Sequence, residues 1–355
     1  MTEPTKLDAY LDEAKGPAAL VLREELAPVE GPEGVFFPPT FASGEGFAGG
    51  YNIDGDPKGT NVCLVDSVGS QANRIEPIFG KAPYDALVPQ VTIKAGEKLI
   101  SLLEAGHRAG DAIVRCSALQ EDLQKAFASL LRGDATALAD IAPTSLVFGV
   151  WDSRDTQAKA PRLVASTIRA YDVRRLTRSA QYMPATDYVA DGLLDEPADT
   201  KTAKAYSERG FRHVPASASH GGVIALGGLR REATLSLAAL RHLRAGTDPV
   251  RTRALQRYVL GLALTAFTAP VSGYLRQGCN LVLDPSKPRS VDEVYPTGER
   301  KPLTLTHDEA LAYTKAAAGA YGVGASRSVD FDRERAKSDL GDGEKKGKKK
   351  AKAKS

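Results

Sequence analysis

The chain has 355 residues, of which 42% are hydrophobic and 26% charged, the balance typical of a soluble globular protein with a large core. Its longest apolar run, Tyr258–Phe267, is too short to cross a bilayer, and its first residues lack the apolar core of a secretion signal, so we expect no membrane contact. Three widely spaced cysteines form no C-x-x-C pair, which argues against a disulfide scaffold or zinc ribbon and favours a cytoplasmic location.

The net charge of +3 conceals an uneven distribution. Residues 345–355 hold seven lysines and no acidic residue, so that residues 1–344 alone carry a net charge of −4. Composition predicts that residues 326–355 form a disordered, lysine-rich tail. Such a tail attracts nucleic acid without reading its sequence.

The first sixty residues predict little regular structure. Lys6–Ala14 favours a short helix, and Ala18–Leu26 fits either a strand or a second helix. Pro28–Thr60 is rich in Gly, Pro and Phe and predicts a long irregular segment. Its G-x-G-x-x-G motif at residues 44–49 follows no strand and opens no helix, so a dinucleotide site is not expected.

The segment Asn61–Phe79 predicts a helix that ends near Glu76, because Pro77 disfavours helix at the residue before it. Apolar residues recur at steps of three and four, as on a buried helix face, at Leu64, Val65, Val68, Ala72 and Ile75. The other side carries short hydrogen-bonding groups and one arginine, at Asp66, Ser67, Ser70, Asn73 and Arg74. This face is typical of one that contacts a phosphodiester or a packed neighbour.

The middle of the chain predicts elements of both types. Leu87–Lys94 alternates like a strand, and Lys98–Ala142 has a largely helical pattern. Ser145–Trp151 fits a buried strand, with Trp151 itself a candidate for the core, and is followed by a polar loop. Pro161 then suits the first turn of a helix that would place three polar residues on one face, namely Arg162, Ser166 and Arg169.

The last part of the chain continues this mixture. We expect strands at Tyr171–Met183, Gly221–Gly228 and Leu275–Leu283, with a polar excursion at Thr186–His220. The expected helices begin at Leu229, at Pro249 behind the capping residue Asp248, and at His307, the last running to about Ala318.

This order of elements predicts an α+β fold. Strands and helices alternate without a strict βαβ rhythm, which favours a ferredoxin-like, RRM-like core with large helical and loop insertions. We expect a single domain over residues 1–325, with insertions at about 28–60, 97–142 and 184–220, followed by the tail.

Candidates for catalysis are few. His213 and His220 lie seven positions apart on a polar segment, and Asp152 and Asp155 follow the Trp151 strand where nuclease carboxylates would bind a metal. Arg154 lies between these aspartates and favours ion pairing instead. No nucleophile elbow, Walker or zinc-protease motif is present. We therefore expect no catalytic residue, no metal site and no cofactor, and retain a nuclease as the alternative.

Arginines gather in two stretches, as in proteins that bind a polyanion along a defined path. The first comprises Arg154, Lys159, Arg162, Arg169, Arg174, Arg175 and Arg178. The second comprises Arg230, Arg231, Arg241, Arg244, Arg251, Arg253 and Arg257. Arginines that only decorate helix surfaces would give the same pattern.

Three segments, in their order along the chain, carry a family resemblance: LVDSVGSQANRIEP, SLVFGVWDSRDTQAKAPRLVASTIRAYDV and HGGVIALGGLRREATLSLAALRHL. Over roughly Leu20–Leu283 the chain resembles the RAMP-superfamily backbone subunit (the "Cas-seven" role) of type I-G, formerly I-U, CRISPR effector complexes. The resemblance implies an RRM-like palm with finger- and thumb-like insertions and a non-enzymatic role.

The resemblance also implies the partners. Several copies would stack head to tail along a CRISPR RNA in a Cascade-type antiviral complex, a helical filament that presents the spacer for pairing with target DNA. Other effector subunits would join this filament, and a separate helicase–nuclease would cut the DNA.

Motif position and side-chain chemistry together give the candidate RNA-binding residues. Such contacts must be neutral to sequence, because base pairing reads the target. The candidates are Ser67, Gln71, Asn73, Arg74, Arg154, Lys159, Arg162, Arg178, Gln181, His220, Gly221, Gly222, Arg230 and Arg231. Gly221 and Gly222 would let backbone approach RNA closely. Gln71 lies near the apolar edge of the predicted helix, so a structural role is its alternative. An RNA-processing or target-cleaving nuclease, or a scaffold whose arginines serve only subunit contacts, are the competing hypotheses.

Overall fold

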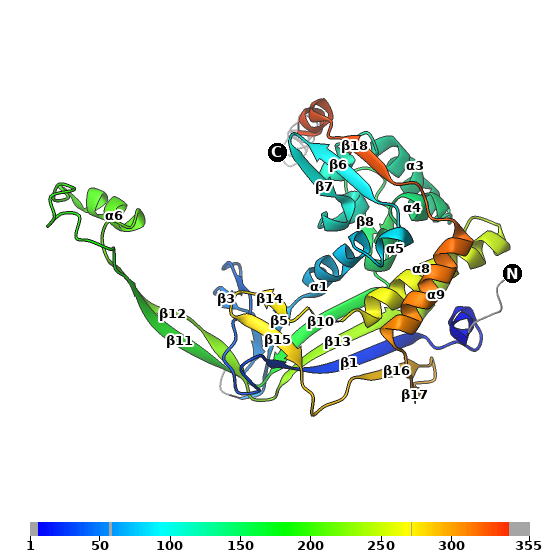
Figure 1. The fold of residues 1–355 in the computed structure, drawn as a ribbon, viewed down its shortest axis with the longest axis horizontal. Coiled ribbons are helices and arrows are strands. Elements are labelled where there is room, and N and C mark those ends of the chain that lie inside the picture. The colour runs from blue at the N-terminus through cyan, green and yellow to red at the C-terminus, as the bar shows by residue number, and fades with distance from the viewer. Residues whose placement is uncertain (1–5, 57–58, 271, 341–355) are drawn as a thin grey trace, which may run out of the picture.

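The structure, a computed structural model, describes residues 6–56, 59–270 and 272–340 (Figure 1). Its centre is an antiparallel sheet in the order β14-β15-β1-β13-β10-β5-β4, with β16 also pairing with β1 and β17 with β16. These strands are β1 (Ala19–Pro28), β4 (Ile53–Gly55), β5 (Asn61–Asp66), β10 (Val164–Tyr171), β13 (Leu229–Ser236), β14 (Tyr274–Arg276), β15 (Cys279–Leu283), β16 (Ser290–Val294) and β17 (Arg300–Pro302). Strand β1 therefore lies between strands from the second half of the chain.

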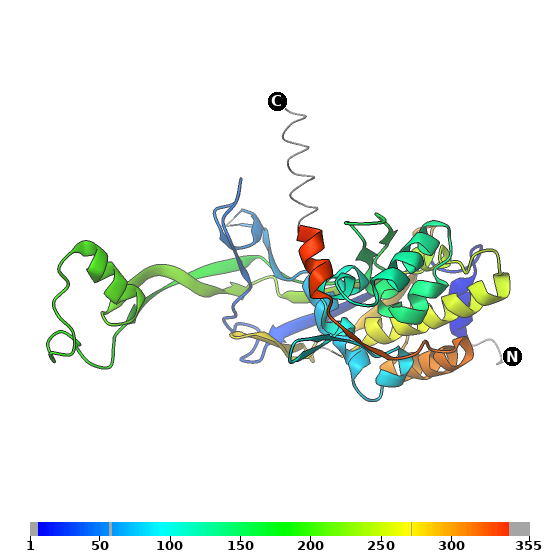
Figure 2. The same cartoon turned by 90° about the horizontal axis from the view of Figure 1, so that it is seen from above.

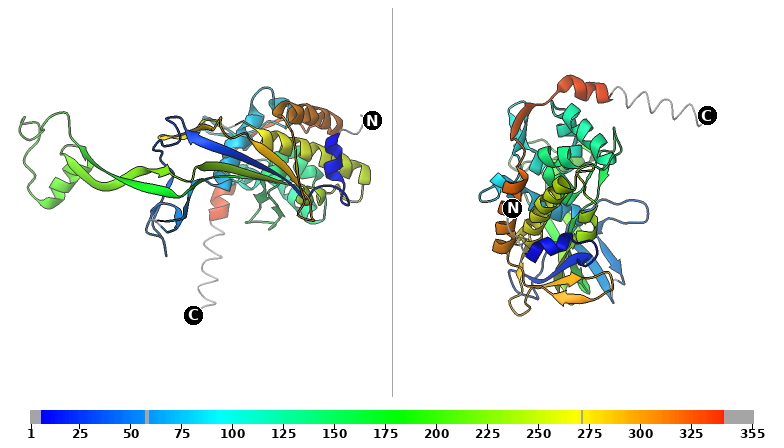
Figure 3. Two further views of the ribbon diagram at one scale, coloured as in Figure 1. Left: turned by 90° about the horizontal axis from the view of Figure 1, so that it is seen from below. Right: turned by 90° about the vertical axis from the view of Figure 1, so that its right-hand side faces the viewer.

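Period-2 alternation gives the sheet one buried face. Leu20 and Leu22 of β1 are buried, and the register places Leu22 opposite the buried Ala233 of β13. Helices lie on this buried side of the sheet (Figure 1): α1 (Val68–Ile75), α7 (Leu237–Arg241), α8 (Pro249–Thr268) and α9 (His307–Tyr321). The other face of the sheet, seen in Figure 3, carries the exposed Arg23 and Thr234.

The helices α8 and α9 pack at very short range. Asp248 caps α8, because its side chain accepts from the backbone N–H groups of Val250 and Arg251 at 2.9 Å. A Cβ at Gly261 would lie 2.9 Å from the Cα of Thr314, so this helix crossing requires glycine. The predicted starts of both helices, at Pro249 and His307, are confirmed.

A smaller layer stands beside the main sheet. It contains β6 (Val91–Ala95), β7 (Lys98–Ser101) and β18 (Arg327–Asp330), the helices α2 (Ala112–Arg115), α3 (Gln120–Leu131), α4 (Thr136–Ile141) and α5 (Pro143–Phe148), and the hairpin β8 (Val150–Trp151) with β9 (Lys159–Ala160). Strand β18 pairs with β6 in parallel, and a helix follows over residues 333–340. The prediction of disorder from residue 326 is therefore wrong up to residue 340, and the rest of the predicted tail, 341–355, lies outside the described residues.

A long two-stranded ribbon projects from the body, as Figures 1 and 2 show. It consists of β11 (Val173–Tyr182) and β12 (Val214–Ala225), with α6 (Thr200–Glu208) at its far end. We call residues 173–225 the arm. The short strands β2 (Thr40–Phe41) and β3 (Gly50–Tyr51) belong to the segment at its base, where Phe36 forms a bridge with Val223.

The α+β class is confirmed, but four predicted elements have another type. Residues 61–66 form β5 rather than helix and pair with β10 and β4. Ser67 caps α1 by accepting from the Ser70 N–H at 3.2 Å, so the helix begins only at Val68. The predicted strand at 145–151 is mostly α5, which ends at Gly149 with a φ of +82° that favours glycine.

The predicted helices at 161–169 and 229–236 are the strands β10 and β13. In β13 the buried positions are Leu229, Arg231, Ala233 and Leu235, a strict alternation that the charge of Arg231 concealed. The predicted helical stretch from Lys98 likewise opens with β7 before its helices begin.

The predicted polar excursion at Thr186–His220 contains α6 and much of β12.

No helix among the described residues combines the length and apolar character that crossing a membrane demands.

Candidate nucleic-acid interface

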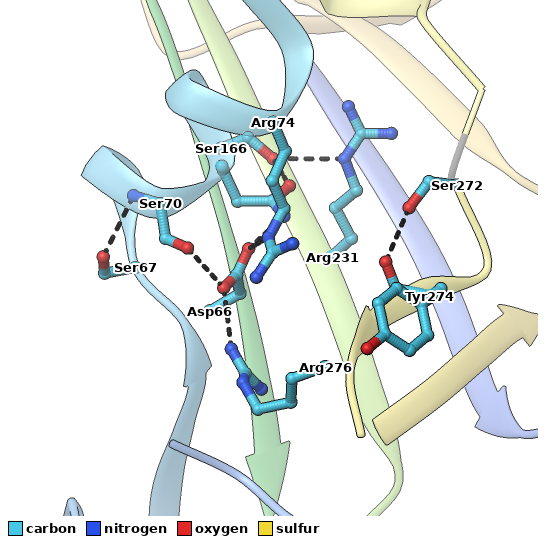
Figure 4. Close-up of polar contacts among 10 residues, drawn as sticks. Asp66, Ser67, Ser70, Arg74, Ser166, Arg231, Ser272, Tyr274 and Arg276 are labelled. Atoms are coloured by element: carbon cyan, nitrogen blue, oxygen red, sulfur yellow. Dashed lines mark hydrogen bonds and ion pairs between the residues drawn. The ribbon is translucent and has the colours of Figure 1, made fainter. Parts of the chain in front are cut away.

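A buried carboxylate organises the junction of β5, α1 and β14 (Figure 4). Asp66, the last residue of β5, accepts hydrogen bonds from Ser70 Oγ (2.7 Å), Gln71 Nε2 (2.6 Å), Arg74 Nε (3.1 Å) and Arg276 Nη2 (3.0 Å). Two guanidinium groups share one carboxylate, so this Asp66 cluster keeps a net positive charge. The side chains of Arg74 and Arg276 remain 33% and 24% exposed, which leaves them accessible to an anion.

The polar edge of α1 borders this cluster. Ser67 is half-buried and caps the helix, and Arg74 is exposed in its last turn. The exposed Asn73 accepts a hydrogen bond at Oδ1 from Arg108 Nη2 (3.3 Å), which fixes the orientation of its amide. Asn73, Arg74 and Ser67 therefore remain candidates, joined by Arg276, which the sequence prediction missed.

Two of the predicted RNA contacts are buried inside the protein. Gln71 accepts from Ser166 Oγ at 2.9 Å, and Ser166 in turn accepts from Arg231 Nε at 3.1 Å. Arg231 pairs with the buried Glu24 at 2.8 Å. The local sequence does not reveal that Gln71 and Arg231 are buried, because the strands that cover them lie far away in the sequence. Their side chains instead join α1, β10, β13 and β1.

Arg230, the neighbour of Arg231, lies on the opposite face of the sheet and is also engaged. Its Nε donates to Glu25 at 2.7 Å, a bond that raises the pKa of Arg230, and its guanidinium lies 5.0 Å from the centre of the Tyr171 ring. The predicted phosphate contact would have to compete with this ion pair.

Of the other five arginines in the second cluster, four fasten the N-terminal segment to the body, and Arg251 instead donates to the Tyr321 carbonyl of α9. Arg241 donates to the carbonyl oxygens of Tyr10 and Pro17, and Arg257 forms an ion pair with Asp8 at 2.8 Å. These contacts hold the 3-10 helix η1 (Lys6–Leu11) in place. A polyanion path along this cluster is not supported.

A buried ion pair lies beneath Asn73. Arg108 Nε is 2.6 Å from Glu76 Oε2, and both side chains are almost fully buried. Burial raises the pKa of Glu76 to about 7 in spite of the opposing charge of Arg108. Arg108 has a φ of +55° and also donates to the Gly149 carbonyl at 3.4 Å, so it links α1 to the start of β8.

The hairpin β8–β9 presents several cations beside this pair. Lys159 and Arg154 are exposed, and Arg162, which follows β9, is exposed as well. Arg162 donates from Nε to the Phe148 carbonyl at 2.8 Å, and burial together with the nearby Arg108 lowers its pKa. Trp151, considered above for the core, is 52% exposed with Lys159 Nζ 4.6 Å from its ring centre.

The two candidate metal-binding aspartates serve the hairpin loop. Asp152 is buried and accepts from the N–H and the hydroxyl of Thr156 at 2.8 and 2.6 Å. Asp155 accepts from Gln120 at 3.0 Å. Among the described residues there is no cluster of three or more His, Cys, Asp or Glu that could hold a metal. The geometry gives these aspartates a structural role.

The two candidate catalytic histidines are far apart. His213 lies beside a cavity of about 610 Å³ at the far end of the arm, whereas His220 packs edge-on against Tyr51 at its base, with ring centres 4.9 Å apart. Seven residues of extended strand, at about 3.3 Å per residue, separate them by roughly 20 Å. This separation argues against a catalytic pairing of His213 with His220 and favours the alternative, histidines that form ordinary contacts within the chain.

The glycines next to His220 serve contacts within the chain. A Cβ on Gly222 would lie 2.5 Å from Val35 Cγ1, and one on Gly221 would lie 2.7 Å from the Thr177 carbonyl carbon. Gly222 is buried, has a φ of +92°, and donates to Tyr51 Oη at 3.0 Å. Close approach of the chain to itself, rather than of RNA, explains both glycines.

Strand β11 of the arm carries the remaining candidates, Arg178 and Gln181, together with Arg174 and Arg175 of the first arginine cluster, and all four are exposed. Arg178 lies 5.9 Å from the ring centre of Phe37. None of these three arginines, nor Arg154, Lys159 or Arg162, forms an ion pair with another described residue. The structure thus leaves the cations of the hairpin and the arm without ion pairs among the described residues, whereas Arg74, Arg230 and Arg231 are paired with carboxylates.

Comparison with models of known protein families finds a match over part of the chain. Residues 20–175 match the model of a family described as CRISPR-associated protein GSU0053 (Cas_GSU0053). No curated protein matches the chain. The matched residues include β1, β5, α1 and the hairpin β8–β9, but not Arg276 or most of the arm. Over this part of its length the chain is similar to the GSU0053 family of CRISPR-associated proteins, which supports a role in a CRISPR system.

Proposed function

We propose that this protein is the RNA-binding backbone subunit of a type I-G, Cascade-type effector complex. Copies would assemble head to tail along a CRISPR RNA in the cytoplasm and present the spacer for pairing with target DNA. The subunit would be non-catalytic, would bind other effector subunits, and would leave cleavage to a separate helicase–nuclease. The match to a CRISPR-associated family over residues 20–175 supports the biological context.

The observation that carries this proposal is the set of unpaired cations on the hairpin and on the arm. Residues 1–344 have a net charge of −4, yet Arg154, Lys159 and Arg162 on one projection, and Arg174, Arg175 and Arg178 on the other, lack carboxylate partners among the described residues. Exposed cations of this kind bind phosphates and release counterions. Phosphate contacts carry no sequence information, as a subunit serving many different spacers requires.

The shape of the arm supports assembly into a filament. A strand of ten residues such as β11 spans about 33 Å at roughly 3.3 Å per residue, and an isolated two-stranded ribbon is only marginally stable in water. We infer that a neighbouring subunit, the RNA, or both cover the arm in the assembled particle. A contact from the arm of one copy to the body of the next is heterologous and produces an open helical array.

The test uses a triple variant on the arm, Arg174→Ala, Arg175→Ala and Arg178→Ala, and a control, Arg23→Ala, whose side chain is exposed but paired with Glu232 at 3.4 Å. Both are co-expressed with the operon partners and a CRISPR RNA. We expect the triple variant to lose most of the co-purifying RNA and to lower the slope of log affinity against log salt by about 2, at roughly 0.7 per phosphate contact.

The control should assemble normally. Assembly of the triple variant with an unchanged salt slope would refute the proposed role of the arm. Specific cleavage of labelled repeat RNA by the purified protein would refute the non-catalytic assignment.

A further inference from the structure

The single tryptophan of the chain lies at the surface rather than in the core. Trp151 ends β8 with 52% of its side chain exposed, although large aromatic side chains normally gain from burial. Its neighbour across the hairpin, Lys159, lies with Nζ 4.6 Å from the ring centre. An exposed aromatic ring beside a cation is the combination with which proteins hold single-stranded nucleic acid.

The hairpin holds this ring on a rigid support. Asp152 N donates to the carbonyl of the fully buried Ala158 at 2.9 Å, and the Asp152 carboxylate binds Thr156, so the loop is closed from within. Beneath the hairpin, Gly110 allows close contact, since a Cβ there would lie 2.8 Å from the Trp151 carbonyl oxygen. A backbone held in this way needs no rearrangement when a ligand stacks on the ring, which lowers the entropic cost of binding.

The hairpin also adjoins the polar edge of α1. Arg108 donates to the carbonyl of Gly149, the residue before β8, and to Asn73 of α1, so one guanidinium links the two elements. Figure 2 shows the hairpin projecting on the same side of the body as the helix over residues 333–340. Lys159 lies beside the ring, and Arg162 follows β9 with its Nε bonded to the Phe148 carbonyl. Both side chains are exposed and have no ion-pair partner among the described residues, which leaves them available to phosphates.

We propose that Trp151 stacks on an unpaired base of single-stranded nucleic acid, while Lys159 and Arg162 bind the adjoining phosphates; this inference rests on the proposed function. Every base has a π-face, so stacking is compatible with a subunit that must accept any spacer. The base belongs either to the guide RNA or to a DNA strand, and both offer the same chemistry to the indole ring.

Because Trp151 is the sole tryptophan, its fluorescence reports on this site alone. The full-length protein is titrated with oligo(U) RNA, with oligo(dT), and with an abasic oligonucleotide of equal length, each labelled so that anisotropy records binding independently. We expect base-bearing strands to quench the emission and to protect it from iodide, and the abasic strand to bind without either effect. Stronger quenching by oligo(U) assigns the base to RNA, and by oligo(dT) to DNA.

Two variants sharpen the test. Trp151→Ala should weaken binding of base-bearing strands about tenfold, within the range known for one base–aromatic stack, and should leave abasic binding unchanged. Arg178→Ala, on the arm, should lower the affinity but preserve full quenching at saturation. Anisotropy that shows tight binding without any change in emission would refute the stacking while leaving the proposed function intact. An absence of binding to every strand would refute both.

Discussion

Replacement of Asp66 by alanine should expose how much stability the buried carboxylate supplies. Hydrogen bonds to a charged group contribute about 1.5–3 kcal/mol each, and Asp66 accepts four, two of them from arginines. Arg74 and Arg276 are 33% and 24% exposed, so water would replace part of what they lose. Water cannot reach the buried Gln71 amide in the same way, and leaving this amide without its acceptor costs about 1–3 kcal/mol. We expect the free energy of unfolding to fall by about 4 kcal/mol.

Urea denaturation followed by circular dichroism measures this loss, provided that the slope against urea is the same in both proteins. The matched control is Asp292→Ala, whose carboxylate pairs with Arg300 at 3.4 Å on the exposed side of the sheet and should contribute less than about 1 kcal/mol. In a double-mutant cycle, Arg276→Ala should cost less in the Asp66→Ala background than in the wild type. A loss for Asp66→Ala no larger than that of the control would refute the idea that this carboxylate organises the junction.

Three further predictions concern other parts of the molecule. The pKa of Glu76 is raised from 4.5 to about 7 in the folded state, so between these pH values the folded protein binds one more proton than the unfolded chain, and the free energy of unfolding should fall as the pH rises. Glu76→Gln should flatten that fall in a series of urea denaturations at different pH, and equal pH profiles would contradict the prediction. Gly261→Ala should force the Thr314 backbone away and lower the unfolding free energy by about 1–3 kcal/mol, whereas Gly319→Ala, with open space around it, should not. Deletion of residues 341–355 should weaken RNA binding modestly and flatten its salt dependence without changing the melting temperature. Deletion of residues 326–355 also removes β18 and should lower the melting temperature. Equal melting temperatures of the two deletion variants would show that β18 does not contribute to stability.

Local signals predicted the elements that local interactions determine. The Asp248–Pro249 pair correctly marked the start of α8, because a cap and a first-turn proline act within four residues. The strand β11 was recognised from its own sequence. In contrast, the sequence of β13 predicts a helix, because Arg231 occupies an inward position of the strand and its partner Glu24 lies 207 residues away. Nothing near Arg231 in the sequence shows that this charge is neutralised.

The candidate site divides in the same way. Chemistry and position indicated Arg74, Lys159 and Arg162, which the structure leaves accessible. Arg276 was missed, since its link to Asp66 spans 210 residues and its strand showed no polar pattern. Gln71 lies near the apolar edge of the predicted helix, which leaves both an RNA contact and a structural role open; its burial against Asp66 and Ser166 favours the structural role.

The position of β1 has a consequence for synthesis in the cell. Leu22 pairs with Ala233, so β1 waits after synthesis for a partner translated about 210 residues later. At about 5–20 residues per second this delay amounts to roughly 10–40 s, during which both edges of an apolar strand lack their native neighbours. Nascent chains are therefore most exposed to aggregation over this interval, and chaperone supply during translation should decide how much of the protein reaches its native state.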